Sequence, residues 1–208
     1  MSKKLLGNLQ KGLLFVISAP AGTGKSTLTQ MLIDEFPQQI VQSCSSTTRL
    51  PRPGEIDEHH YQFISKEEFE NKVFNGEFLE HAKVFGNDYG TNKAEVEKLT
   101  SSGKHVILVI DIQGAKQLME TTDAIFIFIA PPNFQELKKR LIRRRTEDEE
   151  TMVKRLMQAK VELDQAKNYD YQIINDKIDI SYQVLRSIVI AEEHKKLKIT
   201  QIGEINGN

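Results

Sequence analysis

The chain has 208 residues, enough for one sizeable hydrophobic core with smaller subdomains attached to it. Apolar residues make up 39% and charged residues 27%, and a net charge of −1 provides no global basic field for nucleic acid, so an electrostatic function must be local. Cys44 is the single cysteine, which excludes an internal disulfide framework, and residues 1–12 lack the apolar stretch of a signal peptide. No run approaches the roughly 18 apolar residues of a membrane helix. We therefore expect a cytoplasmic protein with neither nucleic acid nor membrane as a partner, while the oligomeric state stays open.

The first elements predicted along the chain are a buried strand and a helix. Residues 13–18 (LLFVIS) form a nearly continuous apolar run, as expected of a parallel strand that is buried on both faces. After a glycine-rich turn, apolar residues from Leu28 to Phe36 recur with helical spacing until Pro37 ends the pattern.

Further strands alternate with helices in the rest of the chain. The runs 106–111 (VILVID) and 124–130 (AIFIFIA) predict two buried strands, and 171–175 (YQIIN) is a weaker candidate for another. A helical pattern over 133–146 opens with a capping pair, Asn133 and Glu136. The alternation predicts an α/β fold with a mainly parallel sheet.

Two segments depart from this alternation. Residues 40–92 are rich in Ser, Thr, Arg, Gly and aromatic residues and show short strand signals, which predicts an inserted subdomain with strands of its own. Residues 133–160 are dense in charge, with five arginines close to a run of acidic residues. The tail 199–208 is expected to be disordered.

The stretch SAPAGTGKST at 18–27 is typical of a phosphate-binding loop between a strand and a helix. Its glycines permit the backbone to turn successive N–H groups toward one anion, and the helix that follows directs its positive N-terminus at the same place. Lys25 could reach the β- and γ-phosphates, and the Ser26 hydroxyl could help to hold Mg²⁺. Ala19 replaces the first glycine of the motif, which a small residue with negative φ can do; the alternative reading is a structural turn with a surface lysine. The residues expected to bind ATP here are Ala19, Pro20, Ala21, Gly22, Thr23, Gly24, Lys25, Ser26 and Thr27.

A second candidate anion site lies in the loop-like segment 45–55 (SSTTRLPRPGE). It places Arg49 and Arg52 three residues apart, and its two prolines reduce the entropy lost when the loop binds a ligand. Two guanidinium groups that converge on a phosphate would form bidentate, charge-assisted hydrogen bonds. The alternative is a solvated turn with two surface arginines.

Several segments together resemble the guanylate kinase family. They occur in the family's order from about Gly12 to about Lys195, nearly the whole chain, and their combination is highly specific. The segments are SSTTRLPRPGE at 45–55, HHY at 59–61, FLEHAKVFGNDYGT at 78–91, VIDIQG at 109–114, RRRTEDEE at 143–150 and YQIINDK at 171–177.

The resemblance implies phosphorylation of GMP, and of dGMP, by ATP with Mg²⁺ as the cofactor. It also implies that the whole chain is one domain with three parts. These are a P-loop core at 12–39, 93–132 and 161–198, a GMP-binding subdomain at 40–92 and a lid at 133–160.

Carried over by position, the resemblance assigns the acceptor phosphate to Arg49, Arg52, Tyr61 and Tyr89, and the guanine base to Ser45, Glu80, Thr91 and Asp111, with Glu55 supporting the arginine loop. Guanine presents N1–H and N2–H₂ as adjacent donors, and an ionised carboxylate offers only acceptors. Glu80 is therefore the first candidate for reading the base, and Asp111 is the second. Adenine would leave a buried carboxylate unpaired, a penalty that can reach roughly 10⁴-fold. Outside this pattern, Glu80 would be read as a surface carboxylate.

The resemblance also matches Arg140, Arg144 and Arg155 to the phosphate-contacting arginines of the lid. Together with Lys25 and Arg49, they are expected to stabilise charge on the transferred phosphoryl group. A charge-rich helix is also commonly a solvated face, where ion pairs four residues apart explain part of its composition. Asn175 matches a residue near the donor adenine, and the alternative for it is a structural role at a strand end.

Two positions depart from the family pattern. Val109 stands where many members have the first aspartate of Asp-Ile-Asp, so metal placement would depend on Ser26, the phosphates and water, which Mg²⁺ tolerates. Arg145 replaces a common glycine of the lid turn, and it either contacts phosphate or points outward. His59 and His60 lack further His or Cys at a metal-binding spacing, and we expect a polar turn there.

Two other functions are weighed against kinase activity on GMP. A scaffold of this fold would bind phosphorylated peptides, but such relatives have lost the phosphate loop that is intact here. A kinase for another nucleoside monophosphate is disfavoured by Glu80 with Asp111, because neither uracil nor thymine offers guanine's paired donors.

Overall fold

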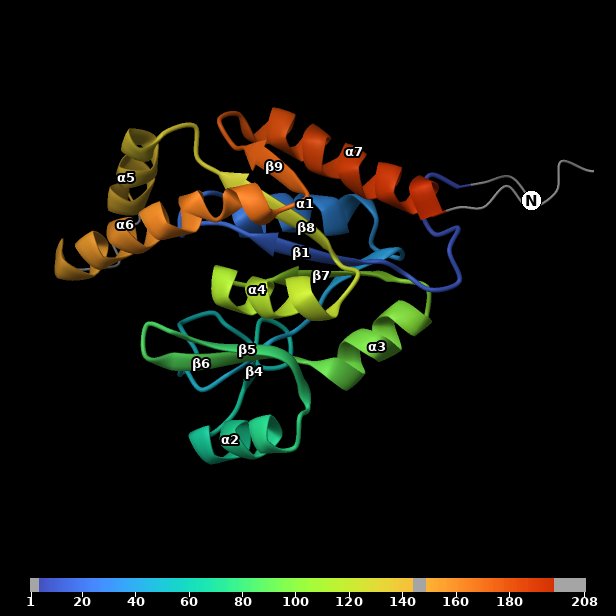
Figure 1. Cartoon of the computed structure of the whole chain (residues 1–208), viewed down its shortest axis with the longest axis horizontal. Coiled ribbons are helices and arrows are strands. Elements are labelled where there is room, and N and C mark those ends of the chain that lie inside the picture. Colours follow the sequence, from blue (N-terminus) through green and yellow to red (C-terminus); the bar gives the residue numbers. More distant parts are fainter. Residues whose placement is uncertain (1–3, 144–148, 197–208) are drawn as a thin grey trace, which may run out of the picture.

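The computed structural model describes residues 4–143 and 149–196 of the chain (Figure 1). In chain order its elements are β1 (Leu14–Ser18), α1 (Lys25–Glu35), β2 (Ile40–Gln42), β3 (Ser46–Thr47), β4 (Gln62–Phe63), α2 (Lys66–Phe74), β5 (Phe78–Val84), β6 (Asn87–Asn92), α3 (Lys93–Ser101), β7 (His105–Val109), α4 (Ile112–Thr121), β8 (Ile125–Ala130), α5 (Phe134–Arg143), α6 (Glu149–Asp164), the short 3₁₀ helix η1 (Ala166–Asn168), β9 (Tyr171–Ile174) and α7 (Ile178–Lys196). The four predicted apolar strands are β1, β7, β8 and β9, and α1 ends before Pro37 as the sequence predicts.

The central sheet has the strand order β2-β7-β1-β8-β9, and all of its neighbouring strands pair in parallel. This confirms the predicted α/β fold with a mainly parallel sheet. The boundary at residue 40 needs correction, because β2 was expected in the inserted segment but Ile40 pairs with His105 of β7 in the central sheet. A strand of three residues carries too little alternation for its sequence to show which sheet it joins.

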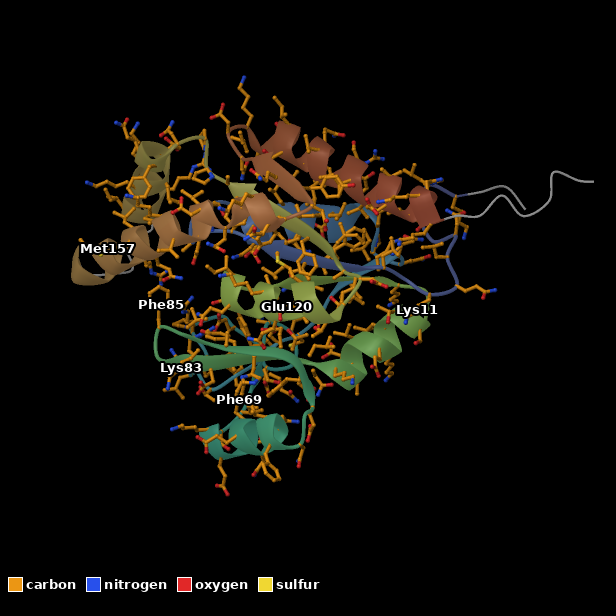
Figure 2. All side chains as sticks on the ribbon, viewed as in Figure 1. Lys11, Phe69, Lys83, Phe85, Glu120 and Met157 are labelled. Atoms are coloured by element: carbon orange, nitrogen blue, oxygen red, sulfur yellow. The ribbon has the colours of Figure 1, made fainter. Side chains whose placement is uncertain are left out.

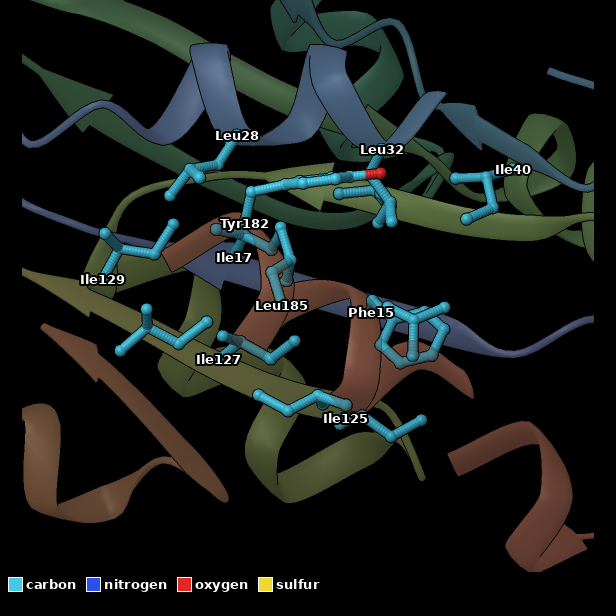
Figure 3. Close-up of a cluster of buried hydrophobic side chains, with 14 of the residues drawn as sticks. Phe15, Ile17, Leu28, Leu32, Ile40, Ile125, Ile127, Ile129, Tyr182 and Leu185 are labelled. Atoms are coloured by element: carbon cyan, nitrogen blue, oxygen red, sulfur yellow. The ribbon is translucent and has the colours of Figure 1, made fainter. Parts of the chain in front are cut away.

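Helices cover both faces of the central sheet, and alternate residues of each strand point to opposite faces. Phe15 and Ile17 of β1 belong to a core cluster with residues of α1 and α7, which Figure 3 shows in close-up. Val16 faces the other way and belongs to a second cluster with residues of α3, α4 and η1. Burial on both faces explains why these strands read as continuous apolar runs.

A smaller sheet, with strand order β4-β3-β6-β5, lies beside the α4 face of the core together with α2 (Figure 1). Its longest pair is the antiparallel hairpin β5–β6, whose two-residue turn has positive φ at Phe85 (48°) and Gly86 (84°). Two positive φ values are what a tight hairpin turn requires. The segment after β2 thus forms strands of its own, as predicted.

The charged segment after β8 folds into α5 and α6, which lie at the same end of the molecule (Figure 1). Asn133 caps α5, since its Oδ1 accepts a hydrogen bond from the Glu136 N–H at 2.8 Å. The Glu136 carboxylate accepts from Arg140 Nε at 3.1 Å, so the predicted pair supplies one capping bond and one ion pair. The predicted end of this helix at residue 146, and the tail 199–208, lie outside the described residues.

Within residues 4–143 and 149–196, none of the helices combines the length and the hydropathy that crossing a bilayer requires.

Candidate active site

The phosphate-binding loop connects the end of β1 to the start of α1. Gly22 and Gly24 adopt left-handed backbone conformations, with φ of 85° and 91°. A Cβ on Gly24 would lie 2.5 Å from Asn175 Nδ2, so this position needs a glycine both for its conformation and for space. The helix N-terminus and the turned backbone that the sequence predicted are therefore both present.

Hydrogen bonds within the loop hold its shape. The Thr23 hydroxyl donates to the Pro20 carbonyl at 2.8 Å, and Lys25 Nζ donates to the Ala19 carbonyl at 3.0 Å. Ala19 and Pro20 are buried and Ala21 is half-buried. Ser26 and Thr27 are exposed on the first turn of α1, where their hydroxyls can reach a bound group.

Asn175 and Arg140 join this loop to β9 and α5. The buried Asn175 side-chain amide donates to the Thr23 carbonyl at 2.6 Å, and the backbone carbonyl of Asn175 accepts from Arg140 Nη1 at 3.0 Å. Asn175 therefore has the structural role that the sequence left open as an alternative. Arg140 lies beside the loop, close to Gly22.

The arginine loop is held by Glu55, as predicted. Arg49 donates to both oxygens of the Glu55 carboxylate at 2.9 Å, and the Arg52 N–H donates to the same carboxylate at 2.7 Å. The Arg49 guanidinium keeps the pKa of Glu55 below its usual range. The Arg52 side chain itself is exposed.

Two tyrosines line the same region. The Arg49 guanidinium lies 5.3 Å from the centre of the Tyr61 ring, and the Tyr61 and Tyr89 rings are 5.9 Å apart. Hydrogen bonding to Glu55 and to Tyr89 raises the pKa of Arg49, so the guanidinium stays charged. Three of the four predicted acceptor-phosphate residues, Arg49, Tyr61 and Tyr89, thus lie together.

Glu80 is the most distinctive group in the smaller sheet. Its side chain on β5 is 3% exposed, and one carboxylate oxygen accepts from the Thr91 hydroxyl of β6 at 2.5 Å. Burial raises the pKa of Glu80 to about 7, the Thr91 hydrogen bond opposes that rise, and the nearby Asp111 charge adds to it. The surface alternative for Glu80 is therefore wrong. Ser45 precedes β3 and is half-buried, and its carbonyl accepts from the Gln62 N–H at 2.9 Å.

Val109 is the last residue of β7 and Asp111 lies two positions further along, and the two side chains have different surroundings. Asp111 caps α4, since its Oδ1 accepts from the backbone N–H groups of Gln113 at 3.1 Å and Gly114 at 3.0 Å. Val109 packs against the core cluster of α1 and α7. Val109 thus adds an apolar contact at a position where an aspartate would place its carboxylate against the same core.

Arg155 and Phe85 bring the lid and the smaller sheet together. The Arg155 guanidinium on α6 lies 5.1 Å from the centre of the Phe85 ring, at the tip of the β5–β6 hairpin. Figure 2 shows Phe85 on the side of the hairpin that faces the lid. Arg144 and Arg145 lie outside the described residues.

Sequence reasoning missed Glu162, a carboxylate of α6 near the phosphate loop. Burial raises its pKa to about 6, while the charge of Lys25 lowers it and the charge of Asp111 raises it. The Asp111 charge therefore raises the pKa of both Glu80 and Glu162, after burial, which is the largest cause for each. The sequence signal for Glu162 was its spacing of seven residues from Arg155, because residues seven apart lie on one face of a helix.

Sequence reasoning also missed the contacts between α4 and β5. Gln117 accepts from the His81 N–H at 3.2 Å and donates to the His81 carbonyl at 2.8 Å, and Gln113 donates to the Lys83 carbonyl at 3.3 Å. Since β5 is an edge strand of its sheet, these side chains satisfy backbone groups that would otherwise lack partners.

The family model for guanylate kinase matches residues 11–192. The chain is 52% identical over 189 residues to guanylate kinase of Protochlamydia amoebophila, covering 91% of this chain and 95% of that one. It is 48% identical to guanylate kinase of Clostridium tetani, covering 89% and 88% of the two chains. The crystal structure of guanylate kinase from Anaplasma phagocytophilum superimposes with a TM-score of 0.74 at 35% identity, covering 93% of this chain and 91% of that one. With a phosphate loop, a buried carboxylate in an added sheet and these matches over most of its length, the chain belongs to the guanylate kinase family of phosphotransferases.

Proposed function

We propose that the protein transfers the γ-phosphoryl group of ATP to GMP, with dGMP as a further acceptor. The observation that supports this most directly is Glu80, a buried carboxylate that guanine's adjacent N1–H and N2–H₂ donors would satisfy. A phosphate oxygen of GMP attacks the γ-phosphorus, the bond to the oxygen that bridges the β- and γ-phosphates breaks, and ADP leaves. None of the assigned contacts involves the 2′-hydroxyl, which is why dGMP is included.

On the donor side, the residues of the loop 19–27 bind the ATP phosphates, and Lys25 neutralises the charge between them. The exposed Ser26 hydroxyl at the start of α1 is positioned for Mg²⁺, which accepts one protein oxygen together with phosphate oxygens and water. Bound there, Mg²⁺ would supply further positive charge at the β- and γ-phosphates. Asn175 supports the loop, and we infer that it also lies beside the adenine.

On the acceptor side, Arg49, Arg52, Tyr61 and Tyr89 hold the GMP phosphate. Arg49 exchanges part of its pairing with Glu55 for the phosphate, since its guanidinium has five donors. Glu80 and Thr91 read the guanine base, with Ser45 and Asp111 beside them. The two bound anions then face each other in one orientation, and this positioning supplies much of the rate.

The lid completes the site on the donor side. Arg140 lies near the loop, and Arg155, with Arg144, is assigned to the transferred phosphoryl group. Water has to be excluded, because it would otherwise accept the phosphoryl group in place of GMP. We place the protein in the cytoplasm, where both nucleotides occur and where a single free thiol such as Cys44 stays reduced.

The test is release of ADP from ATP and Mg²⁺ with GMP, dGMP, AMP, CMP, UMP and dTMP offered in parallel. We expect turnover with GMP and dGMP far above AMP. Lys25→Ala should abolish turnover, and Glu80→Ala should remove most of the preference over AMP. Glu120→Ala, an exposed position on α4, is the matched control that should behave as the unaltered chain does.

Two outcomes would contradict the proposal. Turnover that favours another acceptor would move the protein to a different nucleoside monophosphate. Retained GMP binding with no turnover of any acceptor would favour a binding role, in which the departures at 109 and 145 matter.

A further inference from the structure

The first turn of α4 runs directly past the Glu80 carboxylate. Gly114 lies in that turn, and among the described residues it is the one glycine inside a helix. A Cβ at Gly114 would lie 2.9 Å from Glu80 Cδ and closer still to its Oε2. Real Cβ atoms do not approach other atoms so closely, so the carboxylate occupies the space that a side chain at 114 would fill.

Glycine at this position has no backbone explanation. The helix continues through Gly114 with ordinary hydrogen bonds, and its N–H donates to the Asp111 carboxylate at 3.0 Å. Its φ is not among the positive values that favour glycine. Glycine inside a helix is less stable than alanine, so what favours glycine at 114 is the space needed by a neighbour.

We propose that Gly114 is a positioning residue for acceptor recognition, because it leaves the gap in α4 that lets the Glu80 carboxylate lie against the helix where guanine can reach it. This inference rests on the proposed function, in which Glu80 reads the base.

Other contacts of α4 fix the strand that carries Glu80. The Gln117 amide forms two hydrogen bonds with the backbone of His81, the next residue along β5. Thr91 holds one oxygen of the Glu80 carboxylate from the opposite strand, and Gly114 leaves room for the other. Three neighbours thus fix the position of the carboxylate. Of these, Gly114 is the one at which a single added methyl group would disturb it.

A methyl group at 114 would act on recognition more than on folding. The atoms it meets are the far end of a flexible side chain, apart from Ile110 Cδ1 at 3.3 Å. The least costly response is therefore for the carboxylate to move, which spares the helix and misplaces the acceptors for guanine.

The experiment is a double-mutant cycle of Gly114→Ala with Glu80→Ala, measured both as nucleotide affinity and as the urea midpoint of unfolding. For Gly114→Ala alone we expect the KM for GMP to rise at least tenfold, with the KM for ATP within twofold of the unaltered chain. The preference for GMP over IMP, which lacks the N2 amino group, should fall with it. The pH at which guanosine affinity changes should move below its value in the unaltered chain, because the displaced carboxylate is better solvated. A structural role alone would move neither of these last two quantities.

In the Glu80→Ala background, Gly114→Ala should cause no further loss of GMP affinity. Gly114→Ala should also raise the urea midpoint more in the Glu80→Ala background than in the chain that keeps Glu80. Without the Glu80 side chain the methyl group fits, and alanine stabilises the helix relative to glycine. Glu120→Ala on the same helix is the control and should leave both measurements unchanged. Gln117→Ala should also raise the KM for GMP. In that background the coupling energy between positions 114 and 80 should keep its sign.

An unchanged KM for GMP in Gly114→Ala, or an equal effect in both backgrounds, would overturn the inference. Failure of the proposed function is distinguishable from this, because it would appear as no GMP turnover in the unaltered chain. The cycle in urea midpoints would still report whether the residue at 114 and Glu80 compete for one space.

Discussion

The Glu80 carboxyl group titrates near neutral pH, because burial raises its pKa to about 7. Below that pH it is mostly protonated and offers one fewer acceptor to guanine. Above that pH it is an anion without a cation as its partner in the contacts described for it, and guanine's donors would supply what it lacks. An unfavourable charge that the substrate relieves is a physical basis for selectivity at this residue.

We expect the affinity for guanosine to weaken as the pH falls below about 7, approaching about tenfold per pH unit. Ionisation of Glu80 favours binding, so binding in turn lowers its pKa and releases a proton. Guanosine is the suitable probe because it lacks the phosphate of GMP, which itself titrates near pH 6. Inhibition constants measured between pH 5.5 and 8.5 check this, and Glu80→Gln should give a flat profile. A flat profile in the unaltered chain would mean that Glu80 is not the group that reads the base.

At the scale of single elements, α4 connects the two sheets. Its N-terminus is capped by Asp111, two residues after the end of β7, and its glutamines bond to the backbone of β5. One helix therefore fixes the distance between the phosphate loop's sheet and the strand that carries Glu80. Asp111 consequently has two candidate roles, as a helix cap and as a contact to guanine.

Replacement of Asp111 by alanine and by asparagine separates these roles. Loss of the cap in Asp111→Ala should lower the free energy of unfolding by about 1 kcal/mol, whereas asparagine, a good cap, should keep most of it. If Asp111 also contacts guanine, Asp111→Asn will raise the KM for GMP several-fold at nearly unchanged stability. Urea unfolding and steady-state kinetics on the same samples give both quantities. An unchanged KM in Asp111→Asn would leave the residue with the cap alone.

For the whole molecule, the phosphate loop and a buried polar network lie at opposite ends of two neighbouring strands of the central sheet. The phosphate loop follows the last residue of β1, while His105 is the first residue of the parallel strand β7. Next to the start of β7, the Glu193 carboxylate of α7 accepts from His105 Nε2 at 2.6 Å and from the N–H groups of Gly7 at 2.8 Å and Asn8 at 2.9 Å. His105 Nδ1 accepts from the Leu13 N–H at 2.9 Å, so its Nε2 carries the proton and the ring is neutral. This network ties the N-terminal segment to β7 and α7.

Removal of Glu193 should therefore affect stability and spare catalysis. We expect Glu193→Ala to lower the free energy of unfolding by about 3 kcal/mol, because the N–H donors of Gly7, Asn8 and His105 lose a charged acceptor, with KM values within twofold of the unaltered chain. Burial raises the pKa of Glu193, but the hydrogen bonds from Gly7, Asn8 and His105 outweigh it, and the net pKa is lowered. Its contribution is therefore present above the ordinary carboxyl pKa of 4.5 and is lost as the pH falls through the lowered value. Urea titrations at pH 7 and at pH 4 compare the two chains, and an equal difference at both would contradict this account.

Closure of the lid and the smaller sheet on the substrates is a further expectation for the whole molecule. The lid and the smaller sheet contact each other through Arg155 and the Phe85 ring. We expect the radius of gyration to fall when an ATP analogue and GMP are added together, as measured by small-angle X-ray scattering. GMP added to Lys25→Ala without the analogue is the control for closure of the smaller sheet alone. No compaction with both ligands would mean that the site excludes water in another way.

The apolar strands, the helix that ends before a proline and the glycine-rich loop were predictable from the sequence. β1, β7 and β8 are buried on both faces and read as apolar runs, and α1 ends before a proline. The phosphate loop was equally clear, because its glycines, lysine and serine act through backbone geometry that is local to the loop. β2 was misplaced because three residues do not reveal which strand they pair with.

The amino-acid sequence by itself determined the class of fold, the phosphate loop and, through resemblance, the family. Only the tertiary structure decided what surrounds each side chain. It buries Glu80 and raises the pKa of its carboxyl group, and it bonds the Asn175 side chain to the phosphate loop. It also makes Asp111 the N-terminal cap of α4 and brings Gly114 against a carboxylate 34 positions earlier in the chain. The physical reason is that burial, pKa and steric room depend on neighbours from distant segments, whereas helix spacing and glycine turns depend on residues a few positions apart.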